Sequence, residues 1–145
     1  MKIRLDDVMQ SFSYPFNAVY YYYIPLETVL MFMGGVIYGK AVHGISTEDD
    51  VKKHEEDFIK LPDLGENGRY KVMYGFTTAV RDENAQERIR TELAENGFEG
   101  FEEAVREEKL LLSWFNFRDG IIKEFSRRWC KENGLELIEY EGVEL

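Results

Sequence analysis

The sequence predicts an α+β fold, with a small antiparallel sheet from the N-terminal half packed against a mostly helical C-terminal half. Two runs rich in β-branched and aromatic residues, at 19–24 and 28–33, favour strands. The stretch 98–140 instead repeats its apolar side chains with the spacing of an amphipathic helix. A chain of 145 residues is long enough for a substantial core, and we expect one domain over 1–145.

The two β-rich runs are separated by Pro25-Leu26-Glu27, a spacing that predicts a hairpin. The second run is apolar at every position of 29–33, which is typical of a strand covered on both faces. We expect the segments 36–38 and 40–42 to continue the sheet between glycines. A further short strand or extended connector is predicted at 58–62, where Pro62 closes it.

Capping residues locate most of the shorter helices. Acidic residues in the first turn favour a helix that begins at Leu5, and Ser13-Tyr14-Pro15 is expected to end it. Ser46 or Thr47 is expected to cap a helix that runs to about residue 57. After a predicted loop at 65–68, helices are expected at 70–80, from Asp82 to the pair at 96–97, and at 98–108.

The longest predicted helix follows and ends at 133–134, before a last strand or extended tail at 135–140. Its apolar side chains fall within about a third of the helix circumference, as expected of a core-facing stripe. Burial of so many large side chains would make this helix the main contributor to a single hydrophobic core. The stripe consists of Leu111, Trp114, Phe115, Ile121, Ile122, Phe125 and Trp129.

Composition and charge limit which partners and which cellular compartment are expected. The formal net charge of −10 opposes binding to a polyanion, so nucleic acid is disfavoured, although a local basic patch can act against the total. The one cysteine, Cys130, has no partner for an internal disulfide, and residues 1–10 lack a signal-peptide pattern. The uncharged run 8–26 is too polar for a membrane span. We therefore expect a cytoplasmic protein without a membrane segment.

Residues 34–41 match the phosphate-binding loop pattern G-x-x-x-x-G-K, but several features argue against that function. Ala41 occupies the position of the hydroxyl residue that holds magnesium, and strand-forming residues lie inside the loop. Glycine-punctuated sheet is the better interpretation, and no cofactor is expected.

Two further motifs favour ordinary surface chemistry. Asp50, His54 and Asp57 would share one face of the predicted helix, with spacing compatible with a divalent metal. The whole segment 48–57 is strongly charged, however, so a solvated face is the simpler interpretation and no metal is expected. Cys130 lies near Arg127 and Arg128, whose charges could lower a thiol pKa, but we interpret it as an incidental free thiol.

Arg118 stands out because it falls in the middle of the apolar stripe. A guanidinium at that position must reach solvent, stack on an aromatic ring or pair with a carboxylate. The first interpretation is a structural ion pair or cation–π contact. The alternative is an anion-binding arginine at the base of a cleft.

No catalytic constellation stands out against these interpretations, so an enzyme is disfavoured but not excluded. The leading prediction is a non-enzymatic binding or regulatory module that acts through a protein partner. Its expected contact residues are a basic stripe on the long helix and one face of the tyrosine run, namely Lys123, Arg127, Lys131, Tyr21 and Tyr23.

Two alternatives to this prediction remain open. The first is a nucleic-acid-associated protein that uses the basic stripe. The second is a small-anion binder or enzyme centred on Arg118. The oligomeric state is also open, since the apolar edge at 29–33 could pair with its copy in a homodimer or be covered by the helices.

Several separated segments together resemble an uncharacterised bacterial protein family, number 0158 of the UPF series. The resemblance covers most of the chain in order, and departs from the family pattern at 29–44, which is longer and more apolar here. It implies a shared fold and a group of relatives, but no established reaction. The matching segments are Leu5-Asp6-Asp7, the tyrosine-rich strand with Leu26-Glu27-Thr28, 58–62, Met73 with Phe76, 97–101, 114–118, Trp129 and Asn133-Gly134.

Overall fold

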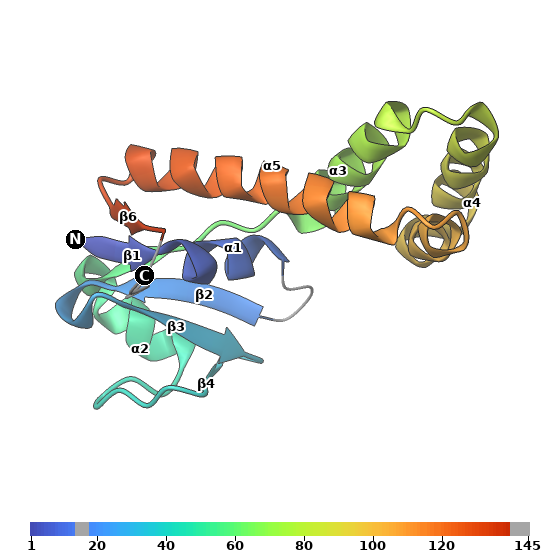
Figure 1. Cartoon of the computed structure of the whole chain (residues 1–145). Coiled ribbons are helices and arrows are strands. Elements are labelled where there is room, and N and C mark those ends of the chain that lie inside the picture. The colour runs from blue at the N-terminus through green and yellow to red at the C-terminus, as the bar shows by residue number, and fades with distance from the viewer. Residues whose placement is uncertain (14–17, 140–145) are drawn as a thin grey trace. The chain divides into compact units, whose positions relative to one another are not determined.

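The computed structural model describes residues 1–13 and 18–139, and its fold is α+β as predicted (Figure 1). The chain divides into two compact units. We call Met1–Asp63 with Lys123–Leu145 the sheet unit, and Leu64–Ile122 the helical unit. Each unit is described by itself, and the single domain over 1–145 stays a prediction. None of the described helices combines the length and apolarity that a bilayer crossing requires.

A four-stranded antiparallel sheet with the order β4-β3-β2-β5 forms the centre of the sheet unit. The predicted hairpin and the short strand after residue 57 are both confirmed. The segment Lys40–Val42 forms no strand, because Gly39 has a φ of +86° and turns the chain away after β4. The strands are β2 (Ala18–Tyr23), β3 (Thr28–Met33), β4 (Val36–Tyr38) and β5 (Phe58–Lys60).

One face of the sheet packs against helix α2 (Glu48–Lys53). Cross-strand partners share a face, and Tyr21 pairs with Leu30 while Val19 pairs with Phe32. This face forms a hydrophobic cluster whose buried members are Leu30, Phe32, Ile45 and Val51.

The predicted helix from 48 to 57 is shorter than expected. Thr47, one of the two residues expected to cap the helix, forms a capping box with Asp50, but α2 ends at Lys53. His54 leaves the helical region, with φ −124° and ψ 42°, and the 3₁₀ turn η2 (Glu55–Asp57) follows before β5 begins. Pairing of β5 with β2 then requires extended backbone from Phe58 onward.

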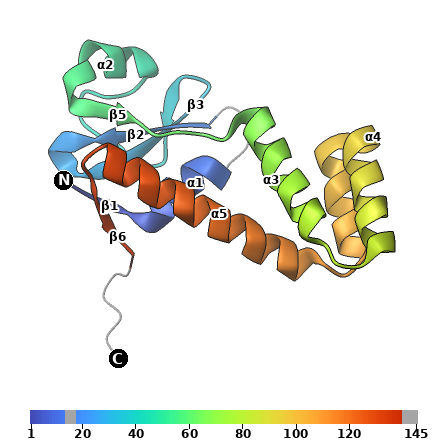
Figure 2. The ribbon, with the colours of Figure 1, turned by 90° about the horizontal axis from the view of Figure 1, so that it is seen from above.

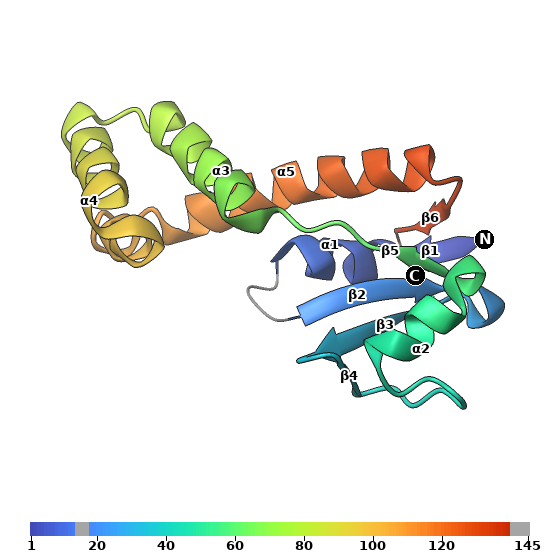
Figure 3. The ribbon, with the colours of Figure 1, turned by 180° about the vertical axis from the view of Figure 1, so that it is seen from behind.

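The other face of the sheet packs against α1 (Leu5–Ser13), and Figures 1 and 3 show α1 and α2 on opposite sides of β2. Val8 and Tyr22 are fully buried here. The helix begins at Leu5, as predicted, and extends to Ser13. The other two residues of the expected stop, Tyr14 and Pro15, lie outside the described residues.

A short parallel pair joins the two ends of the described chain, and the sequence analysis did not predict its first strand. Strand β1 (Lys2–Arg4) pairs with β6 (Glu136–Ile138), as Figure 2 shows. The Tyr22 hydroxyl donates a hydrogen bond to the carbonyl oxygen of Lys2 at 2.6 Å. This bond ties β1 to the centre of the four-stranded sheet.

The helical unit has an aromatic core. Phe76, Phe101 and Trp114 pack edge to face, with ring centroids 4.8–6.2 Å apart. They come from three helices: α3 (Gly65–Ala79), α4 (Glu83–Glu107) and α5 (Leu111–Glu132), which continues into the sheet unit. The predicted loop at 65–68 is wrong, because α3 already begins at Gly65, and burial of its apolar face offsets the weak helix propensity of its glycines.

Gly97 interrupts α4 at the predicted position, and the two halves of the helix run in different directions (Figure 1). Its φ of 65° and ψ of −148° lie in a region that only glycine adopts readily. Asp82 caps the first half, since its Oδ1 accepts a hydrogen bond from the Ala85 N–H at 2.9 Å. Both features confirm the predicted boundaries.

The predicted apolar stripe of α5 is only partly buried. Trp114 and Ile122 are 2% and 1% exposed, whereas Phe115 is 38% exposed. The expectation that the whole stripe faces one core is therefore wrong. The helix contributes to two units, and the apolar face that each unit buries is narrower than the stripe.

We predict that Gly97→Ala destabilises the protein by about 1–3 kcal/mol, because alanine is strained at this backbone conformation. A β-carbon would meet no heavy atom within 4 Å, so strain alone would act. Urea unfolding followed by circular dichroism measures the effect.

The matched control is Gly120→Ala in α5, where a β-carbon also meets nothing within 4 Å and the backbone is helical. This substitution should raise stability by up to about 1 kcal/mol. Equal effects of the two substitutions would contradict the strained conformation at Gly97.

Candidate binding site

An exposed apolar strip lies on the α1 side of the β3–β4 hairpin. Met33 pairs with Val36 and Met31 pairs with Tyr38, so the four side chains project from the same face. Met33, Val36 and Tyr38 are 42%, 55% and 60% exposed. We call Met31, Met33, Val36 and Tyr38 the hairpin strip.

The hairpin strip is exposed because the elements on this side of the sheet lie over β2 and not over β3 and β4. Helix α1 packs against β2, and β1 is hydrogen-bonded to Tyr22 of β2. On β2, the same face holds Tyr20 and Tyr22, which are 5% and 0% exposed. On β3, only the opposite face, with Leu30 and Phe32, is fully buried. The prediction that 29–33 is covered on both faces is therefore wrong.

A groove of about 290 Å³ lies beyond the Met31–Tyr38 end of the hairpin strip, and Val29 and Lys40 form part of its lining. Lys2, Arg4 and Lys40 contribute cations to its lining, against the carboxylates of Asp7 and Glu27. We call this hollow the basic groove. The Lys40 ammonium donates a hydrogen bond to Thr28 Oγ1 at 2.5 Å, so it is held at the groove wall. A local excess of positive charge on a protein of net charge −10 favours an acidic ligand.

Neither edge of β3 is open, since β2 and β4 pair with its two sides. The outer edge of β4 is also partly closed. The Ile37 N–H donates to the Ser46 carbonyl at 2.8 Å, and the Glu48 N–H donates to the Gly35 carbonyl at 2.9 Å. The predicted pairing of 29–33 with its copy through an open strand edge is therefore wrong, and the homodimer itself stays a prediction.

Tyr21 and Tyr23, two of the predicted contact residues, lie on the α2 side of the sheet. Both are partly buried, and the Tyr23 ring lies 4.9 Å from that of Phe58. Tyr21 packs edge to face on Phe32 at 5.5 Å and donates a hydrogen bond to Glu48 Oε2 at 2.9 Å. Burial, together with the Glu48 carboxylate, raises the pKa of Tyr21 to about 12.

The predicted basic stripe of Lys123, Arg127 and Lys131 is exposed, as a contact surface requires. One member of it is engaged within the chain. The Arg127 guanidinium donates two hydrogen bonds to Glu139 Oε1, at 2.5 and 3.1 Å. This pair reduces the charge that the stripe offers to an acidic partner or a phosphate.

Arg118 lies over aromatic rings of its own helix. Its Cζ is 4.9 Å from the Phe115 ring centroid and 5.9 Å from that of Trp114. Its Nε lies 3.4 Å from Asp119 Oδ1, and the side chain is 35% exposed. Partial exposure and stacking on the rings fit the cation–π interpretation, and the contact with the Asp119 carboxylate is long.

The structure bears on two of the motif interpretations. Residues 34–38 form the hairpin turn and strand β4, so the interpretation as glycine-punctuated sheet is confirmed there. The backbone of 36–38 pairs with β3, and the Lys40 ammonium donates a hydrogen bond to Thr28, so neither forms a phosphate loop. Cys130 is 1% exposed, and burial raises the pKa of its thiol to about 11. The expectation that neighbouring cations could lower this pKa is wrong, since desolvation dominates.

The proposed ligand face Asp50-His54-Asp57 does not form. The Asp50 carboxylate accepts hydrogen bonds from the backbone N–H groups of Ser46 and Thr47, which lower its pKa. The break after Lys53 brings His54 close to Glu56 and Asp57 instead.

Comparison with known proteins identifies no relative: no family model, no curated protein and no solved structure matches the chain. The resemblance to the uncharacterised family therefore stays a prediction.

Sequence reasoning missed the hairpin strip as a site. The unbroken apolar run 29–33 was the available signal, but periodicity cannot distinguish a doubly buried strand from one whose second face is left open.

We predict that Cys130 reacts slowly with a thiol reagent at pH 8 in the native protein. Its side chain is 1% exposed and its raised pKa keeps it protonated. One thiol per chain should react rapidly after unfolding in guanidinium chloride. Rapid reaction in native buffer would contradict the buried position.

We predict that Tyr21→Phe lowers stability by about 1 kcal/mol at neutral pH, because the hydrogen bond to Glu48 is lost. The Tyr21 phenol keeps its proton longer in the folded state, so wild-type stability should fall as pH rises from 10.0 towards about 12. The variant should show a shallower fall in urea unfolding across that range. Tyr23→Phe, on the same strand and face, is the control and should behave like wild type.

Proposed function

We propose that this protein is a non-enzymatic binding module that holds a protein partner on the hairpin strip. The observation that carries the proposal is the exposed apolar face of β3 and β4, whose four side chains lie side by side by strand register. Exposed apolar clusters of this kind mark interaction sites in soluble proteins. The strip consists of four side chains, and so small a surface suits a weak, reversible complex.

The partner that this surface fits is an acidic amphipathic segment of another protein. Its apolar side chains would contact Met33, Val36 and Tyr38, and its carboxylates would face the basic groove beyond Val29. Charge complementarity at one end would set the direction in which the segment binds. A cytoplasmic location, in keeping with a single buried thiol, forms part of the proposal.

This assignment differs from the contacts expected from the sequence. Tyr21 and Tyr23 pack under α2, and Arg127 is paired with Glu139, so these groups offer less free surface than the hairpin strip. The basic stripe remains the surface of choice for the nucleic-acid alternative, which predicts binding that weakens steeply with salt. Arg118 remains the centre of the small-anion alternative.

The test is a selection of displayed peptides of random sequence against the full-length protein. We expect enriched peptides that combine acidic and apolar residues and bind with a Kd on the order of micromolar. Val36→Glu should weaken this binding about tenfold or more, because it places a charge in the apolar strip. Lys40→Gln should weaken acidic peptides more than neutral ones.

The control for Val36→Glu is Leu112→Glu, an exposed apolar residue of the helical unit that is 73% exposed. Peptides that bind both variants and wild type equally would overturn the proposal. Enrichment of basic peptides would do the same. A dimer that becomes monomeric on Val36→Glu in sedimentation velocity would identify a second copy as the occupant instead.

A further inference from the structure

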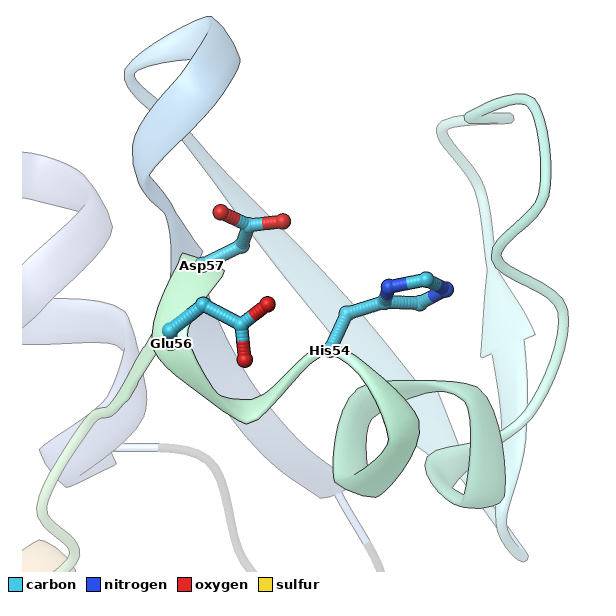
Figure 4. A group of neighbouring side chains, drawn as sticks. All are labelled: His54, Glu56 and Asp57. Atoms are coloured by element: carbon cyan, nitrogen blue, oxygen red, sulfur yellow. The ribbon is translucent and has the colours of Figure 1, made fainter.

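A mixed group of metal-ligating side chains lies at the end of α2, away from the hairpin strip. His54, Glu56 and Asp57 each offer a ligand atom, and these atoms all lie within 4.8 Å of one another. Figure 4 shows the three side chains rising from the same turn, with one ring nitrogen of His54 on the side of the carboxylates. We propose that this turn binds a divalent metal ion of the Zn²⁺, Ni²⁺ and Cu²⁺ class, and Zn²⁺ is the ion used to test it.

The backbone of the turn is held on both sides. The His54 N–H donates to the carbonyl oxygens of Asp50 and Val51, both at 3.2 Å, and the Asp57 N–H donates to the His54 carbonyl at 2.9 Å. Phe58, which follows directly, pairs with Tyr23 in the sheet. The backbone of the turn is therefore already ordered, and only the three side chains need to rotate to bind an ion. This lowers the conformational entropy lost on binding.

The three side chains have no competing role in the part of the chain that the structure describes. None of them forms a hydrogen bond or an ion pair there, unlike Asp50, whose carboxylate caps the start of α2. Glu56 and Asp57 carry like charges on neighbouring residues. A bound cation would offset their mutual repulsion.

The donor set selects the class of metal. An imidazole nitrogen with two carboxylate oxygens suits Zn²⁺, Ni²⁺ and Cu²⁺, whereas Ca²⁺ and Mg²⁺ prefer sites built from oxygen alone. Ligand bonds to Zn²⁺ are about 2.0–2.2 Å, so the donor atoms must draw closer than their present maximum separation of 4.8 Å. His54 and Glu56 are exposed, which leaves their side chains room for that rotation and leaves the remaining coordination positions to water.

An ion bound at this site would link the end of α2 to the residues that precede β5. Because the ion would contact residues on both sides of the break after Lys53, it would bind the folded turn better than the unfolded chain. Metal would therefore raise the stability of the sheet unit in proportion to the logarithm of its concentration.

The experiment titrates Zn²⁺ into the untagged full-length protein and follows both histidines in long-range ¹H–¹⁵N NMR spectra, with calorimetry for affinity and stoichiometry. We expect one ion per chain, a shift of the His54 ring nitrogens, and little change at His43, the other histidine. His54→Asn should weaken binding about tenfold or more, and Glu56→Gln should weaken it to a lesser degree.

His43→Asn is the matched control, because His43 is also exposed but belongs to a different segment. It should leave the Zn²⁺ affinity unchanged. Equal shifts of both histidines, an affinity that His54→Asn does not alter, or no binding at millimolar Zn²⁺ would each overturn the proposal. Circular dichroism of each variant establishes that it is folded, and Glu56→Gln provides an independent test if His54→Asn unfolds.

Discussion

The sheet unit depends on the need to bury a tyrosine-rich strand on both of its faces. Strand β2 lies between β3 and β5, so its phenol rings must enter the two layers above and below the sheet. A buried hydroxyl requires a hydrogen-bond partner. Tyr22 meets that need through the Lys2 carbonyl on the α1 side, and Tyr21 through Glu48 on the α2 side. These two bonds connect β1 and α2 to the centre of the sheet.

The two covering helices differ in how far they extend, and this difference locates both proposed sites. On one side, α1 packs against β2, and β3 and β4 keep the exposed hairpin strip. On the other side, α2 covers Leu30 and Phe32 but ends at Lys53. The chain must then turn sharply to reach β5, and that turn gathers His54, Glu56 and Asp57. Each site thus lies where a covering element ends.

Local chemistry was readable from the sequence where it acts over a few residues. The Thr47–Asp50 box, the Asp82 cap and the break at Gly97 all depend on side chains and backbone within one helical turn. Longer-range features were not readable. The burial of Cys130, which outweighs the cations beside it, depends on what packs against the helix. The parallel pairing of β1 with β6 joins segments from opposite ends of the chain.

The sequence by itself determined the α+β class, the hairpin and most helix boundaries, because hydrophobic periodicity and capping are local properties. The tertiary structure alone decided which apolar faces are covered. Met33 and Leu30 are both apolar residues of the same strand, yet Met33 is 42% exposed and Leu30 0%, because only Leu30 faces a covering helix. Exposure depends on the partner that packs against a face, and no local pattern specifies that partner.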